Sequence, residues 1–193
     1  MAVVLIPDEQ RRLVDLGEIA AFLAPFGIAH QRWPLEERVD PDAAPDTILA
    51  AYEPEIESVK AQGGYVTADV IDVSPQTPNL DAILEKFSKE HTHSEDEVRF
   101  ILKGRGLFHV RPLQGPVFAI QVEAGDLINV PKDTKHWFDL CADKTIRAIR
   151  FFQDKSGWTP HYIADGTHAR YMPVCWGPQH VAAQRPLASA VRI

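Results

Sequence analysis

The fold and the chemistry of this chain depend on residues 90–99, Glu90-His91-Thr92-His93-Ser94-Glu95-Asp96-Glu97-Val98-Arg99. Side chains two residues apart in an extended chain point to the same face, so His91 and His93 are expected to lie side by side, and Glu97 shares their parity if the backbone stays extended. A second strand pair would bring His136 back to the same place. One carboxylate among neutral imidazoles suits a divalent first-row transition metal with open coordination positions.

An HxH pair alone is weak evidence for a metal site, because it occurs by chance and its histidines are often surface or hydrogen-bonded residues. Here further residues follow the pair at regular spacing. Glu97 is followed after six residues by Gly104, and Gly125 is followed after five residues by Pro131 and after four more by His136. This two-part pattern resembles the paired motifs of the cupin superfamily. The resemblance implies a mainly β protein with several α-helices, built as a double-stranded β-helix (jelly-roll) barrel with helices packed outside.

Length and charge restrict the alternatives. A chain of 193 residues with 45% hydrophobic content supports one sizeable core, so we expect a single domain over 1–193 with its barrel at about 65–155 and a peripheral tail at about 178–193. A net charge of -7 argues against binding to nucleic acid or to an anionic membrane. We expect a monomer with a small-molecule partner.

The two cysteines and the N-terminus indicate a cytoplasmic protein. Cys141 and Cys175 are too few for a disulfide framework and fit a reduced cytosolic protein. The first residues have no basic region and too short an apolar run for a signal peptide. No stretch approaches the roughly 20 apolar residues of a membrane span.

Periodicity predicts a strand at 3–6, a helix ending before Pro25, a strand at 28–33, and helices that Asp46 caps and Pro54 begins. A strand at 65–73 and an amphipathic helix from Leu80 to Phe87 follow. Short strands are then expected at 98–102, 107–111, 117–122, 126–130, 137–140 and 146–152. Turn residues separate them, among them Gly104-Arg105-Gly106, which favours a sandwich or small barrel.

Several other side chains are candidates for the interior of the barrel. Strand parity places Arg99 on the face of Glu97, where a charge is costly unless an anion meets it; a rim arginine that extends to solvent is the alternative. Arg150 poses the same question. Phe138 shares the parity of His136, and ordinary core packing explains it equally well. Phe87 and Trp158 are further aromatic candidates for an apolar pocket, although the sequence alone favours core packing for both. The remaining histidines show no ligand spacing and are interpreted as structural or exposed: His30, His109, His161, His168 and His180.

A narrower resemblance covers about residues 15–160. The run 90–100 with Gly104 and Gly106-Leu107-Phe108 is similar to the acireductone dioxygenases of methionine salvage. The match extends through the segments Gly64-Tyr65, Asp69-Val70-Ile71, Asp126-Leu127-Ile128, Val130-Pro131, Thr134, His136-Trp137-Phe138-Asp139 and Ile146-Arg147-Ala148-Ile149-Arg150. The segment EDEVR at 95–99 separates this family from other cupins.

The resemblance implies one Fe(II) or Ni(II) per chain, with the ligands His91, His93, Glu97 and His136. It further implies that Arg99 helps to bind the substrate as a dianion, that Glu90 takes part in metal loading, and that Asp96 transmits conformational change. The substrate is an acireductone, 1,2-dihydroxy-3-keto-5-methylthiopentene, and the second substrate is O2. Fe(II) gives 4-methylthio-2-oxobutanoate and formate, whereas Ni(II) gives methylthiopropionate, formate and CO.

Two other classes of function remain open on the residues alone. A different cupin reaction, such as an isomerase or hydrolase, would use the metal only as a Lewis acid. A non-catalytic cupin would bind a ligand without turnover, although such a protein typically lacks some of the ligands that are all present here.

Overall fold

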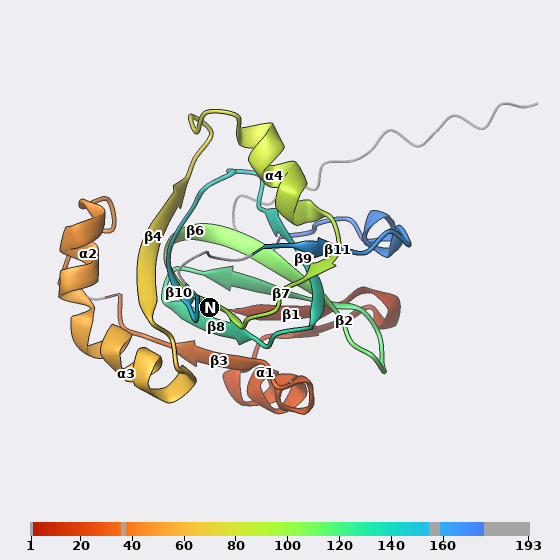
Figure 1. The fold of residues 1–193 in the computed structure, drawn as a ribbon. Helices are drawn as coiled ribbons and strands as arrows, with labels where there is room; N and C mark the ends of the chain where they lie inside the picture. Colours follow the sequence, from red (N-terminus) through yellow and green to blue (C-terminus); the bar gives the residue numbers. More distant parts are fainter. Residues whose placement is uncertain (1, 36–37, 155–158, 176–193) are drawn as a thin grey trace, which may run out of the picture.

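The computed structural model describes residues 2–35, 38–154 and 159–175 and consists of two antiparallel sheets that share strand β6 (Glu97–Arg111) (Figure 1). The first sheet has the order β11 (His161–Tyr162), β5 (His91–Thr92), β9 (Lys135–Leu140), β6, β7 (Phe118–Glu123), β1 (Val3–Ile6) and β2 (Arg11–Leu13). The second sheet contains β3 (Ala29–Arg32), β8 (Asp126–Val130), β6, β10 (Ile146–Phe152) and β4 (Thr67–Val73), and each strand pairs with the next. The predicted mainly β architecture is confirmed.

Strand β6 changes sheets at Gly104. Its first half pairs with β8 and β10, and its second half, from Arg105 on, pairs with β7 and β9. Gly104 has a φ of +78°, and an added Cβ would lie 2.0 Å from the Thr145 carbonyl oxygen, so the bend requires glycine. The predicted turn at 104–106 is therefore wrong, because the chain bends there and continues in the same strand.

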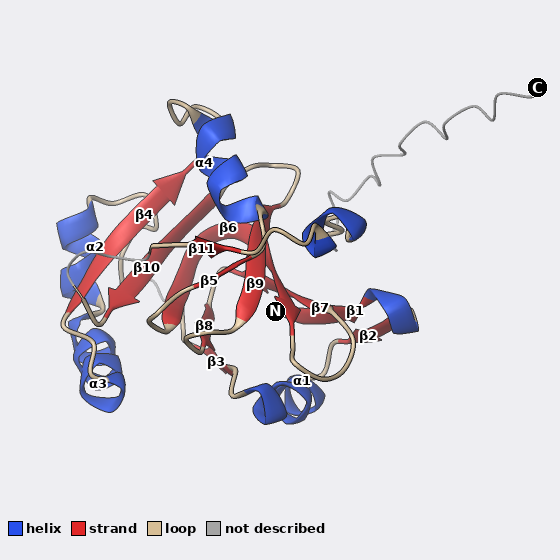
Figure 2. Ribbon diagram, turned by 45° about the vertical axis from the view of Figure 1, so that its right-hand side comes forward, coloured by secondary structure: helices blue, strands red, loops and turns tan. Residues whose placement is uncertain are grey.

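The helices lie outside the two sheets (Figure 2). Helices α2 (Pro45–Ala51) and α3 (Glu53–Gly63) cover the second sheet, while α1 (Leu16–Leu23) and α4 (Leu80–Ser88) lie at opposite ends of the barrel (Figure 1). Asp15 caps α1 by accepting a hydrogen bond from the Glu18 N–H. Three short 3-10 helices complete the described chain, at Pro7–Glu9, Ala24–Phe26 and Thr167–Arg170.

Most predicted elements are confirmed, three of them with the predicted bounds: β1, β8 and β10. The cap of α2 is not: Ala44 occupies that position and Pro45 begins the helix, so Asp46 lies in the first turn. Three short strands, β2, β5 and β11, were not predicted, because two or three residues carry no periodicity.

Three apolar clusters stabilise the fold. The first fills the barrel and includes Ile101, Phe108, Ile120 and Ile128, and α4 adds Phe87 to it. The second lies between the second sheet and helices α2 and α3, and it contains the side chains of β6 that point away from the barrel: Val98, Phe100 and Leu102. The third is small and lies on the outer face of the first sheet, where residues 171–175 of the C-terminal part pack: Leu107, Ala119, Cys141 and Cys175.

The two cysteines form a disulfide, Cys141–Cys175, with a Cα–Cα distance of 5.8 Å. The prediction of reduced cysteines is wrong in this structure. The residues are 34 positions apart and meet only because the C-terminal part of the chain returns across the outer face of the first sheet. Nothing in the local sequence around either cysteine indicates that contact. Among the described residues, no helix is long and apolar enough to cross a membrane.

Candidate metal centre

The four predicted metal ligands converge. His91, His93, Glu97 and His136 are all buried, and one ligand atom from each lies within 4.8 Å of the others. Strand pairing contributes to this convergence: β5 lies beside β9 with His91 opposite His136, while Glu97 begins β6 in the second sheet, opposite Val130 of β8. The chain bends at Ser94 and Glu95, so Glu97 reaches the other ligands from the start of β6 and not by continued strand alternation from His93.

Main-chain carbonyls fix the orientation of all three imidazoles. The Nδ1 atom of His91 lies 2.6 Å from the Lys89 carbonyl oxygen, that of His93 lies 3.1 Å from Thr159, and that of His136 lies 2.8 Å from Thr134. An imidazole whose Nδ1–H donates to a carbonyl presents a lone pair at Nε2, which is the form that binds a metal. All three rings thus direct Nε2 inward.

Glu97 supplies the carboxylate at the centre of this group. Its Oε2 lies 3.1 Å from Nε2 of His136 and 3.2 Å from Nε2 of His93, and its Oε1 accepts hydrogen bonds from the Arg99 guanidinium, 2.7 Å from Nε. Burial alone would raise the pKa of Glu97, but Arg99 and the two imidazoles hold it well below its ordinary value. The carboxylate is therefore ionised and ready to coordinate.

Burial also lowers the pKa of His91 to about 4, and the neighbouring His136 adds to the effect. Neutral imidazoles are the form that coordinates a metal. One carboxylate, three neutral Nε2 donors and no sulfur fit a borderline divalent ion such as Fe(II), Ni(II), Co(II) or Mn(II). Four protein ligands would leave coordination positions of such an ion open for a further ligand.

The loops on either side of the site are held together by Asp96 and His93. The main-chain N–H of Lys132 donates to Asp96 Oδ1, and that of Asp133 donates to the His93 carbonyl. The phenol of Tyr65 donates to the other Asp96 oxygen at 3.1 Å. Asp96 therefore connects the HxH loop to the turn that precedes His136. Sequence reasoning gave Tyr65 no role, and its only signal was its position within the family resemblance.

Arg99 points into the barrel as predicted, and its side chain is 4% exposed. The guanidinium lies 5.2 Å from the centre of the Phe138 ring and 5.6 Å from that of Phe108. Val98 and Phe100 face the opposite way, into the cluster beneath α2 and α3. The alternative of a solvent-exposed rim arginine is excluded.

The pocket candidates lie in different surroundings. Phe138 and Phe87 both belong to the interior cluster, and Phe138 contacts Arg99. Arg150 lies opposite Arg99 in the strand register, but its guanidinium forms a two-pronged ion pair with Asp69 at 2.6 and 2.8 Å. Its charge is therefore largely neutralised within the protein. Trp158 lies outside the described residues.

Glu90 is close to the site in sequence and turned away from it in space. It is fully buried, and its Oε1 accepts a hydrogen bond from Arg111 on the outer face of the first sheet. A direct coordinating role for this carboxylate is not compatible with that position. The histidines without ligand spacing are structural or exposed where described: His30 pairs with Asp126, His109 is buried against Trp137, and His161 is exposed. His168 is partly buried, and His180 lies outside the described residues.

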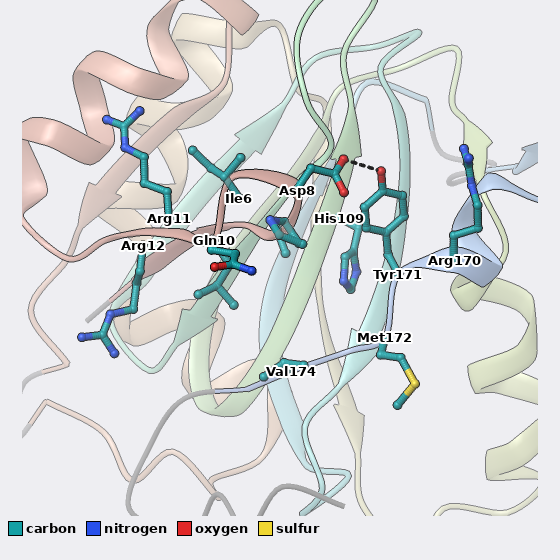
Figure 3. A pocket seen from close by; sticks show the side chains of 13 residues that line it. Ile6, Asp8, Gln10, Arg11, Arg12, His109, Arg170, Tyr171, Met172 and Val174 are labelled. Carbon is teal, nitrogen blue, oxygen red and sulfur yellow. Dashed lines mark hydrogen bonds between the residues drawn. The ribbon is translucent and has the colours of Figure 1, made fainter. Parts of the chain in front are cut away.

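A pocket of about 520 Å³ lies on the outer face of the first sheet, away from the four ligands (Figure 3). Its polar groups are directed at one another or at the rim: Asp8 accepts a hydrogen bond from the Tyr171 phenol at 2.8 Å, and Arg11 lies near Glu9. These groups do not converge on a point within the hollow. Among the described residues, the group of convergent metal-ligating side chains lies on the inner face.

Comparison with known proteins agrees with this geometry. The family model described as the ARD/ARD' family matches residues 8–160. The chain belongs to this family. An acireductone dioxygenase of Picosynechococcus is 41% identical over 86% of this chain and 95% of its own length, and one of Methylococcus capsulatus is 43% identical over 79% and 82%.

A solved structure that is similar to this chain contains a metal ion. The acireductone dioxygenase from Bacillus anthracis, with a cadmium ion in its active centre, superposes with a TM-score of 0.78 and 38% identity. The superposition covers 84% of this chain and 98% of that one. The predicted cupin fold, the predicted family and the presence of a metal-binding group are confirmed.

Proposed function

We propose that this chain cleaves an acireductone with O2 and holds one Fe(II) or Ni(II) through His91, His93, Glu97 and His136. The observation that carries the proposal is the set of three Nδ1–carbonyl contacts, which leaves three Nε2 atoms and one ionised carboxylate within 4.8 Å of one another. The bound ion would supply a Lewis-acidic centre that the enediolate of the substrate could chelate through its two oxygen atoms.

Charge complementarity supports a dianionic substrate. A divalent ion with one carboxylate ligand has a net charge of about +1, and the buried Arg99 guanidinium adds about +1 more. Arg150 contributes little, because Asp69 neutralises it. A substrate with a charge of -2 balances this interior charge, whereas a neutral or singly charged ligand would leave buried positive charge uncompensated.

The remaining residues position the substrate and exclude water. Phe138 and Phe108 flank the Arg99 guanidinium and form an apolar wall, and Phe87 lines the same interior cluster. An apolar wall strengthens the electrostatic attraction of Arg99 for an anion and suppresses competing hydrolysis. We assign Arg99 to substrate binding and Asp96 to coupling the ligand loops, and we propose Phe87, Phe138, Arg150 and Trp158 as residues of the substrate pocket.

The metal switch is the sharpest test of this function. Apo-protein reloaded with Fe(II) should consume O2 with the acireductone and give 4-methylthio-2-oxobutanoate and formate. The Ni(II) form should give methylthiopropionate, formate and CO from the same substrate. If both forms gave only the keto acid, metal-directed cleavage would not hold here. If neither consumed O2, the activity would be another metal-dependent cupin reaction or ligand binding alone.

We further propose a monomeric, cytoplasmic protein that forms a single domain over 1–193. Light scattering at micromolar concentration would measure the mass, for which 21.6 kDa is expected. The Cys141–Cys175 disulfide bears on the compartment, because such bonds are rare in reducing cytosol. Alkylation of thiols in freshly lysed cells, followed by mass measurement, would show how much of the protein is oxidised where it works.

A further inference from the structure

Residues 159–167, here called the covering segment, lie beside β5 at the edge of the first sheet, next to the side of the metal centre that carries His91 and His93. Strand β11 pairs with β5, with Tyr162 opposite His91. The Thr159 carbonyl accepts the Nδ1 contact of His93 at 3.1 Å, and the Ile163 N–H donates to the Glu90 carbonyl at 2.9 Å. Two of the three ligand histidines therefore depend on this segment for their orientation or their strand pairing.

Arg111 connects the covering segment to Glu90 through one guanidinium group. Its Nε donates to Glu90 Oε1, and its Nη2 donates to Asp165 Oδ2 at 2.7 Å. Asp165 in turn accepts a hydrogen bond from the Thr167 N–H, which fixes the end of the segment. The planar fork of an arginine can hold two carboxylates at once in this way, which a lysine cannot do with comparable geometry.

The contact with Glu90 is a charge pair in the interior of the protein. Glu90 is 0% exposed, and its Oε2 has no hydrogen-bond partner among the described residues. Arg111 is the cation paired with it there, while Asp165 is about half exposed. Without the guanidinium, a buried carboxylate would remain uncompensated at the residue next to His91.

We propose that Arg111 is a positioning residue for the metal centre, which holds the covering segment against the strand of His91 and His93 and thereby sets metal affinity. The inference rests on the metal site proposed above, but on no step of the dioxygenase reaction. It also gives Glu90 a physical role: its carboxylate acts on the metal through Arg111 and the covering segment, from the opposite face of the strand.

The test is the dissociation constant for Ni(II), measured by chelator competition on apo-protein without substrate. Arg111→Met should raise this constant about tenfold to a hundredfold, the range found when groups that orient metal ligands are removed. Arg111→Lys should restore part of the affinity. Asp165→Asn should have a smaller effect, at most about fivefold, because that carboxylate is exposed.

Arg147→Met is the matched control. Arg147 is also buried and donates to two main-chain carbonyls, those of Pro41 and Ala43, but on the side of the second sheet. Its replacement should lower the melting temperature without changing the Ni(II) dissociation constant. If Arg111→Met itself folds poorly, Glu90→Gln combined with Arg111→Met removes the buried charge of Glu90 together with its partner and still cuts the connection to Asp165.

Hydrogen exchange supplies a readout that general destabilisation would not reproduce. Because coupling between sites is reciprocal, Ni(II) should slow exchange of the Ile163 amide in the wild type. In Arg111→Met this protection by metal should shrink. An unchanged Ni(II) constant in Arg111→Met, or an equal loss of affinity in Arg147→Met, would overturn the proposal.

The outcomes for this inference and for the dioxygenase function are separable. A wild-type protein that binds Ni(II) with the predicted dependence on Arg111 but consumes no O2 supports this inference and refutes the activity. A wild-type protein that binds no Ni(II) refutes the metal site, and the role of Arg111 with it.

Discussion

Among the described residues, both faces of the first sheet carry buried histidines, but only the histidines of the inner face point their free nitrogens toward one place. Its inner face carries His91, His93 and His136, and its outer face carries His109 of β6 and Asp139 of β9, the strand that also holds His136. On the inner face, main-chain carbonyls occupy each Nδ1 and the remaining donors converge. On the outer face, His109 stacks on Trp137 with an interplanar angle of 4°, and its Nδ1 lies 3.4 Å from Asp139.

This comparison shows that residue type alone does not determine where a metal ion can bind. Burial lowers the pKa of His109 to about 4, as it does for His91, and raises that of Asp139 to about 6. Perturbed titration is thus shared by both faces and cannot distinguish them. What distinguishes them is convergence: several donors must be held by other contacts so that they point to one place.

Replacing one histidine on each face by alanine gives the largest expected difference, which is a difference in bound metal. His93→Ala should remove most of the bound metal and abolish turnover, because a ligand is lost from a site of four, while circular dichroism still reports the β-core. His109→Ala should lower stability yet retain about one metal per chain. Metal analysis by mass spectrometry makes the comparison. Full metal occupancy in His93→Ala would remove the distinction between the faces.

The outer face can be loosened by opening its disulfide. Cys141 and Cys175 close a loop of 34 residues, for which loop entropy predicts a contribution of about 3–4 kcal/mol to the free energy of unfolding. The double variant Cys141→Ala with Cys175→Ala should lose this amount in urea unfolding and keep its metal. The wild type in excess dithiothreitol is the matched control. Equal stability of oxidised and reduced protein would show that the outer face is held by its apolar contacts alone.

The inner face can be altered without removing a ligand by changing Arg99→Leu. Loss of a charge-assisted contact with the substrate should lower kcat/KM about tenfold to a hundredfold, equivalent to about 1.5–3 kcal/mol. Metal content should fall much less, because Arg99 contacts Glu97 but is not itself a ligand. Arg147→Leu, a buried arginine outside the barrel, serves as the control. Unchanged kinetics in Arg99→Leu would mean that the arginine only balances Glu97.

The sequence predicts the inner face well because its information is local. The HxH pair and Glu97 lie within seven residues, and alternation along β6 turns Arg99 to the same side as Glu97, although a bend at Ser94 and Glu95 separates β6 from the HxH pair. His136 is more distant, yet the Gly125 and Pro131 spacing marks the strand that returns it. The family resemblance then supplies the metal and the substrate, which alternation cannot give.

The outer face escapes prediction because its contacts join distant parts of the chain. The Cys141–Cys175 bond, the Glu90–Arg111–Asp165 contacts and the covering segment all depend on where residues 159–175 return. That return involves strands of only two residues, which leave no periodic signal. The predicted turn at 104–106 is wrong for a related reason. In sequence, a glycine that lets a strand change sheets cannot be distinguished from one that reverses the chain.

The smallest expected effect concerns the pH dependence of the outer face. The folded-state pKa of Asp139 is raised to about 6, so its contribution to stability is present at low pH and is lost as pH rises through 6. The folded-state pKa of His109 is lowered to about 4, so its contribution is present above its ordinary value of 6.5 and is lost as pH falls toward 4. Between pH 6 and pH 5 each group changes the free energy of unfolding by about 1 kcal/mol, in opposite directions. The two contributions therefore nearly cancel in the wild type.

Asp139→Asn should lose about 1 kcal/mol more than the wild type on acidification from pH 6 to pH 5, and His109→Gln should lose about 1 kcal/mol less. Urea unfolding at both pH values measures the differences, in which the titration of all other groups cancels. Parallel pH profiles for the wild type and both variants would mean that neither group is shifted, and burial of the outer face would then be shallower than the structure has it.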